Sequence, residues 1–251
     1  MVVLVEAAVA LEAAVLPEGG DMQSLAGHFF TEAEQKEIRQ TVQEAETETA
    51  AEIVVMVVSS SHDYPEARLT ASFLLVLPFV LFVWEFITSF YWWPNGLSWL
   101  FWLCFSSFFL LSYLAIPHFP AVFRHFISPR RAQKEVEREA VLNFYGHSLH
   151  HTKGATGVLI FFSVLERRVW ILGDRGINRV LHPERWQEWV GELIKGIRQN
   201  KQGQVLCQVI KEIGASLENS LPPIADDINE LQDLIIVSSA EANTSRGLII
   251  R

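Results

Sequence analysis

LTASFLLVLPFVLFVWEFITSFY at residues 69–91 and LSWLFWLCFSSFFLLSYLAI at residues 97–116 are the two stretches that decide how this chain is organised. Each reaches the roughly 20 residues that a helix needs to cross a bilayer core of about 30 Å. Pro94 and Gly96 favour a tight turn between them. A buried helical pair in a soluble core is the alternative, but 12 of the 17 Phe and 5 of the 8 Trp fall within residues 69–126. The pattern therefore predicts a transmembrane helical hairpin over residues 68–119.

Basic residues flank the hairpin, whereas none lies between its two runs. They are Arg68 on one side and Arg124, Arg130, Arg131 and Lys134 on the other. Because cytoplasmic segments carry the excess of Lys and Arg, both flanks are predicted to be cytoplasmic. Glu85 is the one formally charged residue between Arg68 and Arg124. An acid in a membrane segment is a functional candidate. Because Glu85 is near the outer end of the first run, we favour the alternative, in which its side chain reaches the membrane–water interface.

Composition excludes several classes of protein. The chain has 251 residues, of which 50% are apolar and 20% charged, so most of it is too apolar for intrinsic disorder. The formal net charge is −9, and no basic stripe is present, which argues against binding to nucleic acid. Two cysteines do not make a disulfide framework.

The remaining segments predict an α/β sandwich, a small mixed sheet flanked by helices. A capping box at Thr31–Glu34 predicts a helix to about residue 50, and the apolar run at 53–58 predicts a buried strand. After the hairpin we expect these elements: a charged helix at 131–151, strands at 156–165 and 168–172, helices starting at Pro183 and after Gly203, and a short acidic helix at 224–237. The hairpin is then inserted into the soluble domain, since the expected sheet partners of the first strand follow it.

This order predicts five parts along the chain. They are an N-terminal extension at 1–27, the first part of the soluble domain at 28–67, the hairpin at 68–119, the second part of the domain at 120–221, and an acidic helix with a loose tail at 222–251. Residues 1–21 lack the basic start of a signal peptide. They suit a short helix or strand, or a non-native start upstream of Met22.

The soluble part resembles the TPM domain. The resemblance rests on GVLI at 157–160, ERRV at 166–169 and GDRGI at 173–177, and it is greatest to bacterial membrane-anchored members. It implies an α/β sandwich and a multi-pass protein of the bacterial inner (plasma) membrane. Some members of this family are acid phosphatases, some are linked to divalent cations, and others are accessory or assembly factors for membrane complexes.

Asp174 and Arg175, between Gly173 and Gly176 at a strand end, are the candidate catalytic pair. The Asp174 carboxylate suits a divalent cation such as calcium or magnesium, and the planar Arg175 side chain suits a phosphate oxygen. The alternative is a structural turn, in which Asp174 bonds to nearby backbone N–H groups.

Two further clusters are weaker candidates for metal ligands. His147, His150 and His151 have the i, i+3, i+4 spacing that places imidazoles on one helical face, although histidines near a helix C-terminus also complement its dipole. An acidic cluster on the expected last helix is more typical of a solvated face. Its members are Asp226, Asp227, Glu230 and Asp233.

The function predicted is that of an accessory, assembly or maintenance factor for membrane proteins. Its partners would be the lipid bilayer and another integral membrane protein, and not nucleic acid. The alternative, which follows from the family resemblance, is a cation-dependent phosphohydrolase resembling the acid phosphatases, with Asp174 and Arg175 at its site.

Overall fold

A computed structural model describes residues 3–4, 24–90, 98–152, 154–218, 220–222 and 233–237. The chain divides into two compact units. Residues 1–62 together with 130–251 form the first, which we call the α/β unit, and residues 63–129 form the second, the helical unit.

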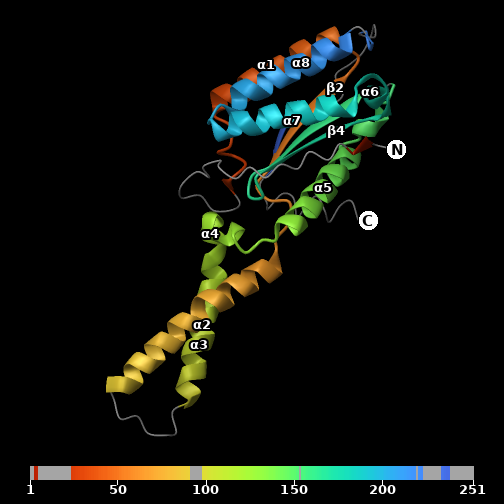
Figure 1. Cartoon of the computed structure of the whole chain (residues 1–251). Helices are drawn as coiled ribbons and strands as arrows, with labels where there is room; N and C mark the ends of the chain where they lie inside the picture. The colour runs from red at the N-terminus through yellow and green to blue at the C-terminus, as the bar shows by residue number, and fades with distance from the viewer. Residues whose placement is uncertain are drawn as a thin grey trace. The chain divides into compact units, whose positions relative to one another are not determined.

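A mixed sheet forms the centre of the α/β unit, with strand order β1-β4-β3-β2-β5 (Figure 1). β2 (Glu52–Val58) runs parallel to both β3 (Gly157–Ser163) and β5 (Leu234–Val237). β4 (Arg168–Gly173) is antiparallel to β3, and the two-residue β1 (Val3–Leu4) is antiparallel to β4. Every residue of β3 and β4 is buried, as expected for strands covered on both faces.

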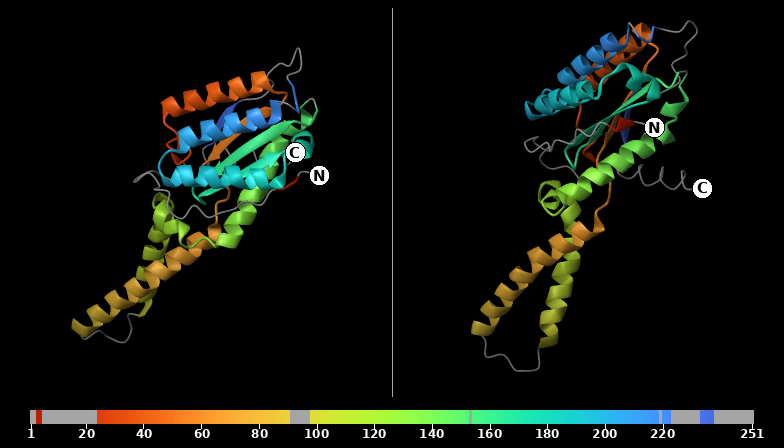
Figure 2. Two further views of the ribbon diagram at one scale, coloured as in Figure 1. Left: turned by 45° about the horizontal axis from the view of Figure 1, so that its top comes forward. Right: turned by 45° about the vertical axis from the view of Figure 1, so that its right-hand side comes forward.

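Helices cover both faces of this sheet. α5 (Pro129–Gly146) packs one face, where Val136, Ala140 and Phe144 join alternate residues of β2, β3 and β4 in one apolar core. α1 (Glu32–Glu48), α7 (Pro183–Arg198) and α8 (Gln202–Glu218) cover the other face (Figures 1 and 2). The structure thus confirms the predicted fold class, a mixed sheet flanked by helices.

The start of α1 follows from its capping box. The Glu34 N–H donates to Thr31 Oγ1 at 3.3 Å, and the Thr31 N–H donates to Glu34 Oε2 at 2.9 Å. These bonds satisfy donors that a helix start otherwise leaves unpaired. The predicted start of this helix is confirmed.

The predicted acidic helix at 224–237 is wrong over its last four residues. Leu234–Val237 form strand β5, which pairs with Val55–Val58 of β2. A run of four apolar residues, three of them β-branched, completes a parallel ladder better than it completes a helix. Residues 223–232 lie outside the described part of the chain.

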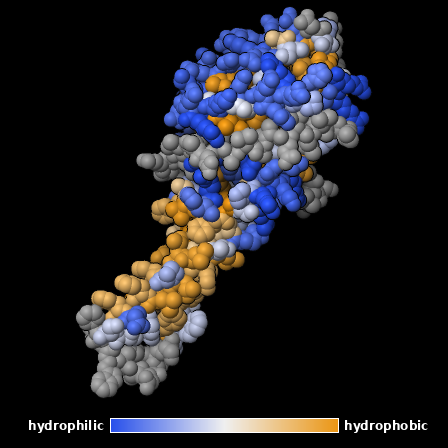
Figure 3. Space-filling view, in the orientation of Figure 1, coloured by the Kyte–Doolittle hydropathy of each residue, from blue (hydrophilic) through white to orange (hydrophobic). Residues whose placement is uncertain are grey.

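The helical unit contains the two apolar runs. α2 (Pro65–Phe90) packs against α3 (Ser98–Ala115) through aromatic pairs such as Phe79 with Phe108 and Trp84 with Phe101, whose ring centroids are 5.5 and 5.4 Å apart. Both helices are long and apolar enough to cross a membrane. Their apolar side chains colour this unit orange in Figure 3. The predicted turn at 92–96 lies outside the described residues.

The helical unit extends beyond the predicted hairpin of residues 68–119. After α3 come a 3₁₀ turn, η2 (Ile116–His118), and a short helix, α4 (Pro120–Arg124). Both contact α2, and the unit ends at Pro129. Residues 120–129, which the sequence assigned to the soluble domain, therefore pack with the apolar helices.

Candidate functional site

Asp174 and Arg175 are adjacent in the chain but differ in burial. Asp174 follows β4 and caps α6 (Arg175–Val180), with its Oδ1 accepting from the Arg175 N–H at 2.6 Å. Its side chain is only 5% exposed, and its Oδ2 is buried without a hydrogen-bond partner among the described residues. The Arg175 side chain is exposed. The structure thus gives Asp174 the capping role of the alternative interpretation and leaves one carboxylate oxygen unused.

The two glycines of this motif allow close packing. A Cβ on Gly173 would lie 2.9 Å from the Trp186 ring, and one on Gly176 would lie 2.6 Å from the Ala155 carbonyl oxygen. The Gly176 N–H donates to that same oxygen at 2.8 Å, and the Asp174 N–H donates to the Gly157 carbonyl at 2.9 Å. The motif is therefore held from both sides, and Gly176 lies inside a helix rather than in an open turn.

A second polar site, which the sequence analysis missed, is a buried cluster of Ser60, Ser61, Ser163 and Glu166. We call it the serine–glutamate cluster. Glu166 Oε1 accepts from the Ser61 N–H at 3.0 Å and from Ser60 Oγ at 3.3 Å, while Glu166 Oε2 accepts from Ser163 Oγ at 2.5 Å. The Ser61 and Ser163 hydroxyls are 2.8 Å apart. All four residues are buried.

The serine–glutamate cluster and the Asp174 motif lie at opposite ends of the strands β3 and β4. In the β3–β4 ladder, Ser163 pairs with Arg168 at one end, and Val158 pairs with Gly173 at the other. The serine–glutamate cluster is therefore at the edge where the parallel strands β2 and β3 end, which is where open α/β sheets usually bind ligands. The run Ser59–Ser61 directly after a buried strand was the signal that could have located it.

The geometry of the cluster suits structure better than chemistry. Ser163 Oγ is within reach of a carboxylate that could withdraw its proton, but the residue is 1% exposed, and a nucleophile must meet its substrate. Both oxygens of Glu166 already accept hydrogen bonds. The cluster ties the β3–β4 turn to the end of β2.

The structure does not bring the weak candidate metal ligands His147, His150 and His151 together on one helical face. No three His, Cys, Asp or Glu side chains converge on a possible metal position within the described residues. α5 ends at Gly146, and Ser148 takes the left-handed conformation with φ of 59°, so helical spacing does not apply. The His150 and His151 rings lie 4.1 Å apart in η3 (Leu149–His151). Desolvation lowers the pKa of His147.

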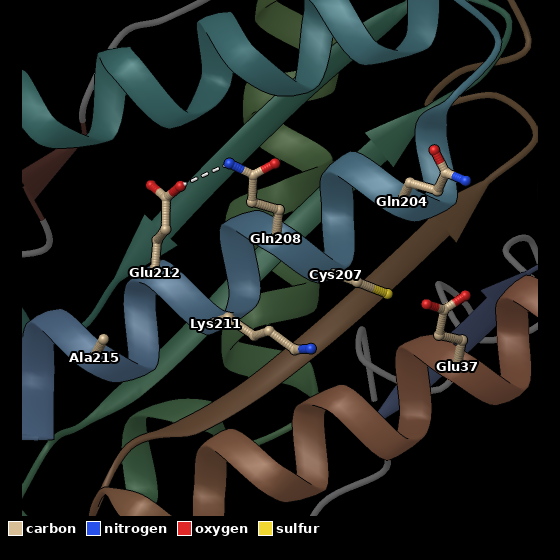
Figure 4. A pocket seen from close by; sticks show the side chains of 7 residues that line it. All are labelled: Glu37, Gln204, Cys207, Gln208, Lys211, Glu212 and Ala215. Carbon is tan, nitrogen blue, oxygen red and sulfur yellow. Dashed lines mark hydrogen bonds between the residues drawn. The ribbon is translucent and has the colours of Figure 1, made fainter.

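A shallow groove lies between α1 and α8, with a volume of about 450 Å³. It is lined by Glu37, Gln204, Cys207, Gln208, Lys211, Glu212 and Ala215. Figure 4 shows the Glu37, Cys207 and Lys211 side chains pointing into the gap. Burial raises the pKa of the Cys207 thiol and so disfavours the reactive thiolate. The hydrogen bond with Thr41 lowers this pKa, but by less. Glu212 is engaged by Gln208 Nε2 at 3.0 Å. The groove holds no activated group.

The acidic cluster predicted near the C-terminus is described in part. Asp226, Asp227 and Glu230 lie outside the described residues. Asp233 precedes β5, and its Oδ2 accepts from Gln43 Nε2 of α1 at 3.0 Å.

The chain matches no model of a known protein family, and comparison with curated proteins gives no match. Its fold is similar to a solved structure. This is the NMR structure of the BA42 protein from the psychrophilic bacterium Bizionia argentinensis sp. nov.. The TM-score is 0.50 and the identity 21%, and the match covers 83% of this chain and 94% of that one. A likeness at this identity shows the fold alone.

Proposed function

We propose that this protein is a membrane-anchored, TPM-like accessory factor that binds another integral membrane protein and assists its assembly or maintenance. The α/β unit would supply a folded domain on one side of the bilayer, and α2 and α3 would be the anchor. The lipid bilayer and a transmembrane segment of the client protein are the partners in this proposal.

The outward face of α2 is the observation that carries the proposal. Phe82 is 71% exposed and Phe86 58% exposed, and the Glu85 side chain is exposed between them. Phe82, Glu85 and Phe86 share a helical face, because residues three and four apart are neighbours. Among the described residues, nothing hydrogen-bonds or ion-pairs with the Glu85 carboxylate. The Glu85 backbone carbonyl, by contrast, accepts from Thr88 and Ser89.

An acid on this face is suited to recognising a partner. Ionisable groups in membrane helices usually pair with one another or face a polar interior. Glu85 is five residues from the end of α2 at Phe90, or about 7.5 Å along the helix axis. A client helix that brings a Lys, Arg or His to this depth would satisfy the carboxylate and cover the two rings. The competing explanation, which the position of Glu85 in the sequence favours, is that its carboxylate reaches the interface alone.

The orientation is part of the proposal. Arg68 and the basic residues from Arg124 onward favour the cytoplasm for both ends of the anchor, for the α/β unit and for both termini. We propose the bacterial inner (plasma) membrane as the location, with two passes. Reporter fusions at the two termini would test this. Reporters active only outside the cytoplasm should stay silent at both ends, and an active one would refute the orientation.

Photo-crosslinking in membranes tests the accessory function. A benzoylphenylalanine at position 82 or 86 of the full chain should give a discrete protein adduct. The same group at Val80, which is 4% exposed, is the matched control and should give less. Glu85→Leu should weaken the adduct, whereas Glu85→Gln, which keeps hydrogen bonding, should weaken it less. Adducts of equal yield from positions 80, 82 and 86 would contradict the proposal.

A cation-dependent phosphohydrolase is the second candidate, and the unused Asp174 Oδ2 is the observation that favours it. A buried carboxylate oxygen without a partner is costly unless something else satisfies it, such as a calcium or magnesium ion. Turnover of an aryl phosphate by the full chain, with either ion present and lost in Asp174→Asn, would support this function. The same turnover in both proteins, or none in either, would exclude a site at Asp174.

A further inference from the structure

The segment formed by η2 and α4 has two faces of different character. Ile116, Pro120 and Phe123 are buried within the helical unit, where η2 and α4 contact α2. On the outside, Phe119 is 60% exposed and Val122 44% exposed. The segment therefore has an exposed apolar side, which the helical unit does not cover.

The exposed apolar side chains of this segment follow those of α3 in the chain. Leu110, Leu111 and Leu114, in the last part of α3, are all largely exposed, and Phe119 and Val122 are the next large apolar side chains in the chain to be so. If α3 crosses the bilayer, η2 and α4 begin at the level where it leaves the hydrocarbon. Phe side chains at that level are typical of segments that lie in the membrane interface.

The stretch of chain that contains η2 and α4 carries charge of one sign, although Asp63 and Glu66 lie at the start of the helical unit. No Asp or Glu occurs from residue 86 to residue 134, while Arg124 lies at the end of α4. Among the described residues, Arg124 has no ion-pair partner. His125 is exposed, and its Nδ1 bonds to the Ala121 carbonyl oxygen at 2.8 Å. At the same end of the helix pair, the Arg68 guanidinium lies 5.3 Å from the Tyr113 ring centroid.

We infer that η2 and α4 form a membrane-interface segment that binds anionic phospholipids. Phe119 and Val122 enter the upper acyl chains of the leaflet at which α3 ends, and Arg124 binds the lipid phosphates. Apolar insertion and basic side chains act together in such segments, because one weak anchor alone is readily reversible. The inference rests on the proposed membrane insertion of α2 and α3, but not on a client protein.

Spin-label accessibility in lipid nanodiscs tests the depth. The full chain would carry one label at a time, with its native cysteines replaced, at Phe119, Val122, Leu110 or Gln199. Leu110 is the reference for the acyl region and Gln199 the reference for water. Labels at Phe119 and Val122 should give intermediate ratios of oxygen to nickel accessibility. Ratios equal to that of Gln199 would overturn the inference. A water-like ratio at Leu110 would overturn the membrane anchor as well.

Lipid selectivity tests the charge. Nanodiscs would contain equal phosphatidylglycerol and phosphatidylcholine, and the lipids that stay bound to the full chain after mild detergent extraction would be measured by mass spectrometry. Arg124→Gln should lower the ratio of phosphatidylglycerol to phosphatidylcholine about fivefold, the effect expected for one basic residue near an anionic surface. Arg179→Gln, at an exposed position of the α/β unit, is the control and should leave it unchanged. An unchanged ratio in Arg124→Gln would overturn the inference.

Discussion

Glu166→Ala should destabilise the α/β unit more than any exposed glutamate substitution does. The change removes the acceptor for the Ser61 N–H and the Ser163 hydroxyl, both of which are buried. A buried donor left without a partner costs about 1–3 kcal/mol. The Ser61 N–H loses its acceptor outright, whereas the Ser163 hydroxyl can still donate to Ser61 Oγ, 2.8 Å away, so we expect a loss of about 2–3 kcal/mol. In a domain of this size, each kcal/mol lowers the unfolding midpoint by about 3 °C, which gives a shift of roughly 6–9 °C.

The assay should report on the α/β unit alone, and Cys207 provides the readout. Its thiol is buried on α8, so it reacts with a maleimide pulse only after the unit opens. In a Cys104→Ala background, the labelled fraction against temperature gives the midpoint. Glu48→Ala, at the exposed end of α1, is the matched control and should shift the midpoint by about 1–2 °C at most.

A double substitution distinguishes the loss of the shared hydrogen-bond network from the loss of two independent side chains. Ser163→Ala alone should be destabilising, but adding it to Glu166→Ala should cost less than the sum of the two, because the partners share one network. A Glu166→Ala midpoint within about 2 °C of the parent protein would refute the structural role that we assign to the serine–glutamate cluster.

Three further outcomes follow from single positions. Gly176→Ala should destabilise the α/β unit by about 1–3 kcal/mol, because its Cβ would lie 2.6 Å from the Ala155 carbonyl oxygen. Gly191→Ala, whose Cβ would have nothing within 4 Å, should stabilise the unit by about 0.5–1 kcal/mol. Thermal unfolding of both variants measures these changes. The pKa of His147 is lowered in the folded protein, so the unfolded state binds the proton more readily, and stability should fall as the pH drops from about 6.5 through the folded pKa. His147→Gln should flatten the dependence of stability on pH over this range. An equal dependence in the variant and the parent protein would contradict the lowered pKa. Cys207, with its raised pKa, should resist iodoacetamide at neutral pH until the chain is denatured, and fast alkylation of the native protein would show that the thiol is neither buried nor protonated.

The elements predicted well are those whose signal is local. Thr31 and Glu34 cap a helix with bonds three residues apart, and the β-branched run at 53–58 is buried whatever its partners are. The apolar runs of α2 and α3 are likewise identifiable from length and composition. Each of these depends on neighbours within a few positions, which is the information that a single sequence contains.

The elements that were missed depend on distant contacts. β5 is a strand because Leu234–Val237 pair with β2, almost 180 residues away in the chain. α6 is six residues long, too short for a periodic pattern, so the sequence predicts Asp174 as a candidate catalytic residue or a turn residue and does not predict that it caps a helix. The helical spacing of the three histidines requires a helix that continues to residue 151, whereas α5 ends at Gly146.

The serine–glutamate cluster depends on distant contacts in the same way. Ser61 and Glu166 are 105 positions apart and meet only after β2 and β3 pair in parallel register. A serine run after a strand is also typical of an ordinary loop, so its burial was not evident from the pattern. Sites built from two strand ends need the strand order first.

The proposed membrane anchor consists of α2 and α3, which are long and apolar enough to cross a bilayer. Alkaline carbonate washing of membranes from cells that express the full chain distinguishes an anchored protein from a bound one, because the wash removes peripheral proteins and retains those that span the bilayer. We expect the protein to stay in the membrane pellet and to leave it only with detergent. Its release into the carbonate supernatant as folded protein would contradict the proposed anchor.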